Sequence, residues 1–372
     1  MKQIICLLLV CLVAAPAWAA EKISVGELEQ RIQSFRDTGK SDQEVTTKLA
    51  EVELTETIPT AALNTLESLL AGQQSRGQLN SLAVQSATLA PPAAEIPSLP
   101  APDLATQKAI ISKCVDYVTK VYMQNPHLAA TKVTTYYGNG IRTFGPSDVS
   151  AFGRAVPGSF GPFGTHTMEI ESENGVEKAP LPGHESKDWR ASQLSAGPVL
   201  SFVLAQAAEG GHLAWQRWQL INGKPSAVFS FAVDKTRSRY EVNYCCFPKV
   251  EAMDIPHMGA SQEVTSSTPF KTTVPFHGAF YIDPDTGTVL RLIMLAEFSP
   301  SDPVHREDTR IDYGPVKVED KALIVPIRAY LQVALVPRGN NDTLGYAEDL
   351  NYSEAEFRNY RIVGSSSSHT SR

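Results

Sequence analysis

The sequence has few of the residues and motifs that catalysis or metal binding would require. It contains five cysteines and eight histidines among 372 residues. It has no Gly-x-Ser-x-Gly elbow, no His-Glu-x-x-His helix and no glycine-rich phosphate loop between a strand and a helix. The histidines are scattered, without the paired spacing of a metal site. We therefore predict no catalytic residues, no metal ligands and no cofactor, and a protein that is not an enzyme.

Basic charge and long apolar runs are also scarce. Lysine and arginine number 33 against 40 aspartates and glutamates, which gives a formal net charge of −7. This balance argues against a nucleic-acid partner, because such a partner usually requires a basic face. The marked apolar run from Ile4 to Ala15 is too short to cross a bilayer, which takes about 20 residues. We expect no transmembrane segment in the mature chain.

Residues 1–19 have the pattern of a cleavable signal peptide. Lys2 precedes the apolar run, and Ala17 and Ala19 supply the small residues of a cleavage site. We predict cleavage near Ala19 and export to the periplasm or the extracellular space. A lipoprotein signal with Cys11 as the acylated residue is the alternative, although Val10 is bulkier than the residue expected before a lipid-bearing cysteine.

Residues 20–89 are predicted to form a subdomain of short helices. Ser24 with Glu27 and Ser41 with Glu44 match the capping-box pattern, and apolar residues recur behind each at helical spacing. In residues 90–103 five prolines exclude a helix or a central strand, and they favour an extended linker.

Residues 104–363 are predicted to form one larger domain. After a helix that begins at Asp103, the hydrophobic pattern changes to period two, with turn sequences at 222–223 and 283–287. The second turn could start a calcium loop, but Met294 stands where the bidentate glutamate is needed. A helix at 195–206 is apolar on nearly every side, so we expect it to be buried. The predicted fold class is α+β, a curled antiparallel β-sheet or half-barrel over a buried helix, with a disordered tail at 364–372.

Three cysteines remain after cleavage: Cys114, Cys245 and Cys246. Neighbouring residues of a strand point to opposite faces, and Cys246 shares the apolar face of its strand with Tyr244. A disulfide between Cys114 and Cys246 is the candidate pairing in an oxidising compartment. The alternatives are buried thiols that pack as small hydrophobic groups and, third, a strained bond between the two neighbours.

Aromatic residues crowd the central strands of the predicted sheet. At alternate strand positions such residues usually form core. The alternative is a hydrophobic concavity for a lipid or acyl chain, because curved sheets hold ligands of this kind. The candidate ligand-lining residues are Trp215, Trp218, Phe229, Phe231, Tyr240 and Tyr244.

Three stretches carry a resemblance to known proteins: Tyr-Cys-Cys at 244–246, the ten residues 282–291, and Asp-Tyr-Gly-Pro-Val at 312–316. On these stretches, the segment from 194 to about 360 resembles a group of uncharacterised exported bacterial proteins. It resembles more distantly the periplasmic lipoprotein-carrier superfamily, whose members curl a half-barrel around a helix and bind acyl chains or lipoproteins. No lipid-binding or lid residue of the carriers matches a position in this sequence. Members of the closer group often have a cysteine in the strand near Val325, and its absence here leaves the cysteine pairing open.

These observations predict an exported, non-enzymatic binding or carrier-like protein of the cell envelope, with a lipid-like or lipoprotein ligand. The alternative is an envelope scaffold without a small ligand, in which the helical subdomain binds a partner. A hydrolase with a site built from scattered residues is a third hypothesis, which no feature of the sequence favours.

Overall fold

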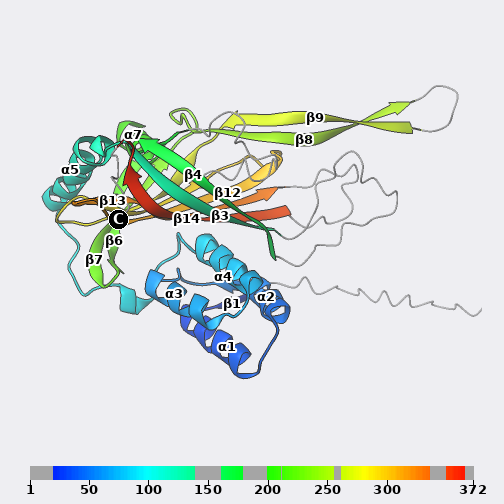
Figure 1. Ribbon diagram of the computed structural model, residues 1–372, viewed down its shortest axis with the longest axis horizontal. Helices are drawn as coiled ribbons and strands as arrows, with labels where there is room; N and C mark the ends of the chain where they lie inside the picture. Colours follow the sequence, from blue (N-terminus) through cyan, green and yellow to red (C-terminus); the bar gives the residue numbers. More distant parts are fainter. Residues whose placement is uncertain are drawn as a thin grey trace, which may run out of the picture.

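The structure is a computed structural model of the chain, and it describes residues 20–138, 161–178, 199–210, 212–254, 261–335 and 349–364. The predicted signal peptide and residues 365–372 of the predicted tail lie outside these ranges. Within them the chain forms six α-helices and a ten-stranded antiparallel sheet that is not closed (Figure 1). The α+β class predicted from the sequence is therefore confirmed.

The N-terminal helices surround a small apolar core of their own. Both predicted capping boxes are present, with Glu27 and Glu44 bonded back to the serines that cap their helices. Val52, which we expected to continue the second helix, instead lies in a short strand that pairs in parallel with residues 21–23. The helices are α1 (Val25–Asp37), α2 (Asp42–Ala50), α3 (Thr60–Leu69) and α4 (Gln73–Gln85), and the two strands are β1 (Glu21–Ile23) and β2 (Val52–Leu54). Their shared core includes Leu28, Leu49, Leu63, Leu66 and Leu79.

A proline-rich linker joins these helices to the rest of the chain. Apart from the 3-10 helix η1 (Ala93–Glu95) it has no regular structure, as its prolines predict. The indole of Trp218 donates a hydrogen bond of 2.9 Å to the carbonyl of Pro100, which ties the linker to the sheet. Helix α5 (Leu104–Lys120) follows, and its N-terminus is capped by Asp103 as predicted. The 3-10 helix η2 (Tyr122–Gln124) comes directly after it.

The main sheet is antiparallel throughout, in the order β5-β4-β3-β14-β13-β12-β11-β10-β7-β6. Its strands do not follow one another in chain order throughout, because β14 pairs with β3 and the hairpin of β8 and β9 leaves the sheet between β7 and β10. The strands are β3 (Leu128–Gly138), β4 (Gly161–Glu173), β5 (Val176–Glu177), β6 (His212–Ile221), β7 (Lys224–Val233), β8 (Glu241–Asp254), β9 (Ser261–Thr273), β10 (Phe276–Ile282), β11 (Val289–Ala296), β12 (Val304–Val318), β13 (Lys321–Leu335) and β14 (Asp349–Ile362).

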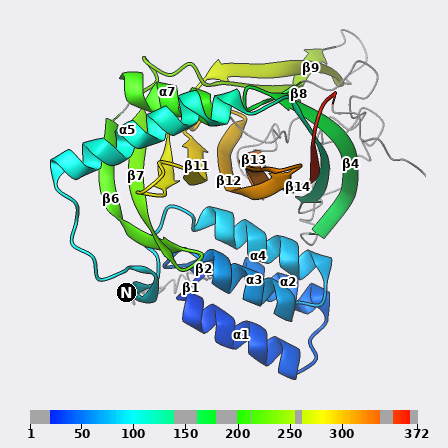
Figure 2. The ribbon, with the colours of Figure 1, turned by 60° about the vertical axis from the view of Figure 1, so that its left-hand side comes forward.

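The two faces of the sheet carry different helices. Figure 2 shows the sheet curving around one side, with α5 and α7 (Leu200–Gly210) across that side and α1 to α4 on the other. We call these the inner and outer faces. Because side chains alternate along a strand, Phe280 of β10 faces the inner core whereas Tyr281 lies on the outer side, in one cluster with Ala87 beyond the end of α4.

Helix α7 is buried on one side only. Leu200, Val203 and Leu204 are buried in the inner core, whereas Ala205 and Glu209 are exposed. The sequence led us to expect burial on nearly every side, but one flank of this helix faces outward. Residues 195–198 of the predicted helix lie outside the described ranges.

The turn between β10 and β11 has the structure that its sequence predicts. The carboxylate of Asp283 accepts hydrogen bonds from the backbone N–H groups of Asp285 and Thr286, and Gly287 has a φ of +76°. This use of Asp283 explains the sequence without a calcium ion. A Cβ atom at Gly287 would lie 2.4 Å from the carbonyl oxygen of Lys113, so the glycine also lets the turn pack against α5.

Candidate functional site

The aromatic side chains predicted to line a ligand site pack mainly against one another. The ring centroids of Phe231 and Phe280 are 4.7 Å apart, and Trp215 lies 4.9 Å from Trp218 and 5.4 Å from Phe229. These residues fill the inner face at the β6, β7 and β10 end of the sheet. None of the six predicted lining residues borders either of the two hollows described below.

Tyr240 and Tyr244 meet at a buried acid that the sequence analysis did not single out. Both hydroxyls donate hydrogen bonds to the carboxylate of Glu307 on β12. Burial raises the pKa of Glu307, and burial together with the nearby carboxylate raises the pKa of both tyrosines. The cluster is sealed beneath the base of the β8 and β9 hairpin, so it stabilises that packing and does not offer an accessible site.

Cys114 lies in the core between α5 and the inner face, and its thiol is free. Burial raises its pKa to about 12, which makes the thiol unreactive at neutral pH. The structure therefore does not form the bridge to Cys246 that we considered. Cys246 belongs to β8, which pairs with β9 outside the main sheet, and its side chain lies outside the described part of the chain.

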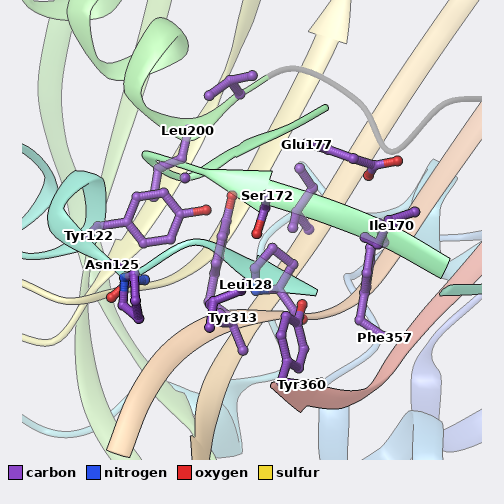
Figure 3. A pocket seen from close by; sticks show the side chains of 17 residues that line it. Tyr122, Asn125, Leu128, Ile170, Ser172, Glu177, Leu200, Tyr313, Phe357 and Tyr360 are labelled. Atoms are coloured by element: carbon purple, nitrogen blue, oxygen red, sulfur yellow. The ribbon is translucent and has the colours of Figure 1, made fainter. Parts of the chain in front are cut away.

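A cavity of about 80 Å³ lies on the inner face, at the end of the sheet away from the aromatic cluster. It is partly open, and it is lined by η2 and the residues after it, the start of α7, and strands from β3 to β5 and β12 to β14 (Figure 3). We call it the Tyr122 cavity. Its walls are mostly apolar, and they include Leu128, Ile170, Leu200, Ile311, Val325, Ala329 and Phe357.

Two tyrosine hydroxyls enter this apolar space without a protein partner. Tyr122 and Tyr313 are only 4% and 6% exposed, and their rings meet edge to face with centroids 6.0 Å apart. Figure 3 shows their hydroxyls directed into the same part of the cavity, near Ser172. Neither hydroxyl forms a hydrogen bond within the described residues, whereas Tyr360 in the same wall donates to the carbonyl of Pro326 at 2.7 Å. Burial raises the pKa of both Tyr122 and Tyr313, so both keep their proton at neutral pH.

One charged pair lies at the edge of the Tyr122 cavity. Glu177 of β5 lines it, and both carboxylate oxygens of Glu177 accept hydrogen bonds from Lys132 at 2.9 and 3.2 Å. The Lys132 ammonium is buried and also lies 5.8 Å from the ring centroid of Phe357. The pair is neutral overall, so the cavity contains no uncompensated cation.

A glycine in the β4–β5 turn fixes the position of Tyr122. Gly175 has a φ of +73°, and a Cβ atom there would lie 2.4 Å from the Tyr122 ring. A larger residue at this turn would displace the ring from the cavity wall. Asn174-Gly175 could be predicted as a turn from the sequence, but its contact with Tyr122 could not.

A second hollow, of about 460 Å³, lies between α3 and the outer face of the sheet. Its charged residues are already paired with one another. Arg291 bonds to Asp312 at 2.5 Å and also to Thr60 of α3, while Arg328 lies 3.3 Å from the carboxylates of both Glu354 and Glu356. These contacts join the N-terminal helices to the sheet, and they compensate the charges of Arg291 and Arg328.

Other chemistry is not indicated by the described residues. No group of three or more histidine, cysteine or acidic side chains lies together there in a way that could hold a metal ion. No helix in the same ranges is long and apolar enough to cross a membrane. Comparison of the chain with protein-family models, with curated proteins and with solved structures finds no match. The resemblance to lipoprotein carriers therefore stays an expectation.

Proposed function

We propose that the chain is an exported, non-enzymatic binding protein of the cell envelope, and that the Tyr122 cavity is its ligand site. The observation that carries the proposal is an apolar cavity on the inner face lined by two buried tyrosines whose hydroxyls have no hydrogen-bond partner among the described residues. Such a combination of apolar walls and a few convergent polar groups is typical of small-ligand sites. In this proposal the curved sheet is a half-barrel that holds a lipid-like ligand against α5 and α7.

The size of the cavity limits what it can take. An engineered cavity of about 150 Å³ holds one benzene molecule, and the Tyr122 cavity has about 80 Å³. It therefore has room for a few carbon atoms, such as one end of an acyl group, and the rest of a longer ligand would remain outside. This differs from the wide aromatic concavity that the sequence suggested, because the aromatic side chains fill that region themselves.

Native mass spectrometry tests this proposal directly. The mature protein would be purified from the envelope of its own host and then extracted with organic solvent. We expect a bound apolar species in the wild type, and its loss when Ala329→Leu or Ser172→Leu fills the cavity. Ser172 is half-buried, so a leucine there is the better tolerated of the two. A folded wild-type protein with a bare mass would overturn the proposal.

The scaffold function remains the second proposal, because one surface feature favours it. Ile96, Leu99 and Leu104, in or beside the linker, are 43%, 48% and 65% exposed. Contiguous exposed apolar patches mark contact surfaces, and these three side chains lie within nine residues of the chain. A bare mass in the preceding experiment, together with a co-purifying protein that is lost in a Leu99→Ser, Leu104→Ser variant, would favour this function.

A further inference from the structure

The Tyr122 cavity also indicates which chemical group its ligand must offer. The side chains of Tyr122 and Tyr313 are buried, and they line the cavity from different elements, η2 and β12. A hydroxyl that lines an apolar cavity without a protein acceptor gains a hydrogen bond when a ligand supplies an acceptor. Two donors that line the same small cavity can both donate to a single oxygen with two lone pairs, and a carbonyl oxygen is such an acceptor.

The charged side chains near the cavity indicate whether the acceptor group of the ligand is neutral or ionised. A carboxylate would have to leave water and lie near Glu177, whose own charge is already compensated by Lys132 at 2.9 Å. Among the described residues, no lysine or arginine lines the cavity. A buried charge without a counter-ion is strongly unfavourable, so a carboxylate ligand is disfavoured whereas an ester or amide carbonyl is not.

We propose that the Tyr122 cavity recognises a short aliphatic group that carries a neutral acyl carbonyl, with Tyr122 and Tyr313 donating hydrogen bonds to the carbonyl oxygen. The inference rests on the proposed function, since it assigns the ligand chemistry of the same site. It distinguishes esters and amides from free fatty acids and from plain hydrocarbons. The aliphatic part lies against Leu128, Ile170 and Ile311.

Four small ligands of similar size separate these classes: methyl butanoate, N-methylbutanamide, butanoate and pentane. Each would be titrated against the full mature chain at pH 7.5 by ligand-observed NMR. We expect the ester or the amide to bind tightest, and butanoate to bind at least about ten-fold more weakly because of its buried charge. The ester arm and the amide arm distinguish an ester lipid from an amide-linked acyl group as the natural source of the carbonyl.

Tyrosine-to-phenylalanine variants test the two donors. Tyr122→Phe and Tyr313→Phe should each weaken binding of the carbonyl ligands about five-fold, and they should leave pentane unchanged. Tyr281→Phe is the matched control, because Tyr281 is a buried tyrosine on the outer face of the sheet and does not border the cavity; it should change no affinity.

The outcomes separate the two proposals. Equal affinities for the ester and pentane, or a carbonyl affinity that neither phenylalanine variant changes, would overturn the carbonyl inference and leave the cavity as an apolar site. Tightest binding of butanoate would also overturn it. If none of the four ligands binds the folded wild type, the proposed function itself fails.

Discussion

Two buried acids five residues apart on β12 have opposite electrostatic environments. Glu307 faces the inner core, where burial raises its pKa and two tyrosine hydroxyls donate hydrogen bonds to it. Asp312 faces the outer side. Burial alone would raise its pKa, but Arg291 and Arg310 at 2.5 and 2.7 Å hold the pKa well below its usual range. The pleat of one strand therefore separates an acid that favours its neutral form from one that stays ionised.

Removing the Asp312 charge should be strongly destabilising. Asp312→Asn would leave the buried guanidinium groups of Arg291 and Arg310 without a counter-ion, and we expect a loss of about 3–5 kcal/mol in the free energy of unfolding. Urea denaturation at pH 7 measures this. Asp116→Asn, which removes an exposed ion pair with Lys120, is the control and should change stability by less than about 1 kcal/mol. Equal effects of the two variants would contradict this interpretation.

Glu307 should make the folded protein less stable as the pH rises. An acid whose pKa is raised in the folded state contributes stability that is present below about 4.5, its unfolded value, and is lost as the pH rises through the folded pKa. Glu307→Gln cannot ionise, so its free energy of unfolding should fall less between pH 5 and pH 8 than that of the wild type. Urea titrations at both pH values measure the difference, and parallel losses in the two proteins would disprove the assignment.

Helix α4 packs closely on the outer face of the sheet because a glycine lies at the contact. A Cβ atom at Gly77 would lie 2.3 Å from the Tyr137 ring. Gly77→Ala should therefore separate α4 from the sheet, although alanine is the better helix former. We expect a loss of about 1–3 kcal/mol. Gly26→Ala in α1 is the matched control, since nothing lies within 4 Å of its Cβ position, and it should be neutral or stabilising.

Helices α3 and α4 also meet the sheet through an acidic cluster. The guanidinium of Arg328 on β13 is shared by Glu67 of α3 and by Glu354 and Glu356 of β14, and Asn80 of α4 donates to Glu354 at 3.3 Å. Burial raises the pKa of Glu354 to about 7, and Glu67 and Glu356 add to the shift, while Arg328 and the more distant Arg310 oppose it. Arg358 also pairs with Glu356, but two guanidinium groups do not balance three ionised carboxylates in this interface.

The contact between these helices and the sheet should therefore weaken as the pH rises. Because the pKa of Glu354 is raised, its stabilising contribution is present below about 4.5 and is lost as the pH passes through about 7. A glutamine at this position cannot ionise. In Glu354→Gln the free energy of unfolding should therefore fall less as the pH rises, by up to about 3 kcal/mol. Proteolysis of the linker at pH 5.5 and pH 8 measures the separation of the helices. A wild-type cleavage rate that is no greater at pH 8, after correction for protease activity, would contradict the prediction.

Elements whose structure depends on residues close to them in the sequence could be predicted from it. The caps at Ser24, Ser41 and Asp103, the turn at 283–287 and strand β10 all lie where the pattern placed them. Helix α4 was the weakest helical pattern, because most of its buried positions are serine, glutamine, asparagine or glycine. Hydrophobic periodicity cannot detect a face that is buried through polar contacts.

At the scale of the whole molecule, the sequence could not show which distant segments meet. The pairing of β3 with β14 joins residues more than 200 positions apart, and no local pattern specifies it. The aromatic strand residues were identified as one face, but the pattern does not show that they fill the space themselves. Tyr122 and Tyr313 were missed because each looks like ordinary core, and only the fold brings their hydroxyls to one cavity.

The polar character of α4 has a consequence for the time course of folding. Its partners lie far along the chain, since Asn80 bonds to Glu354 and Ser81 bonds to Gln332. At roughly 5–20 residues per second, synthesis of the intervening 274 residues takes on the order of half a minute. An apolar α4 face would be prone to aggregation throughout that delay, whereas serine, asparagine and glutamine stay hydrated until the last strand arrives.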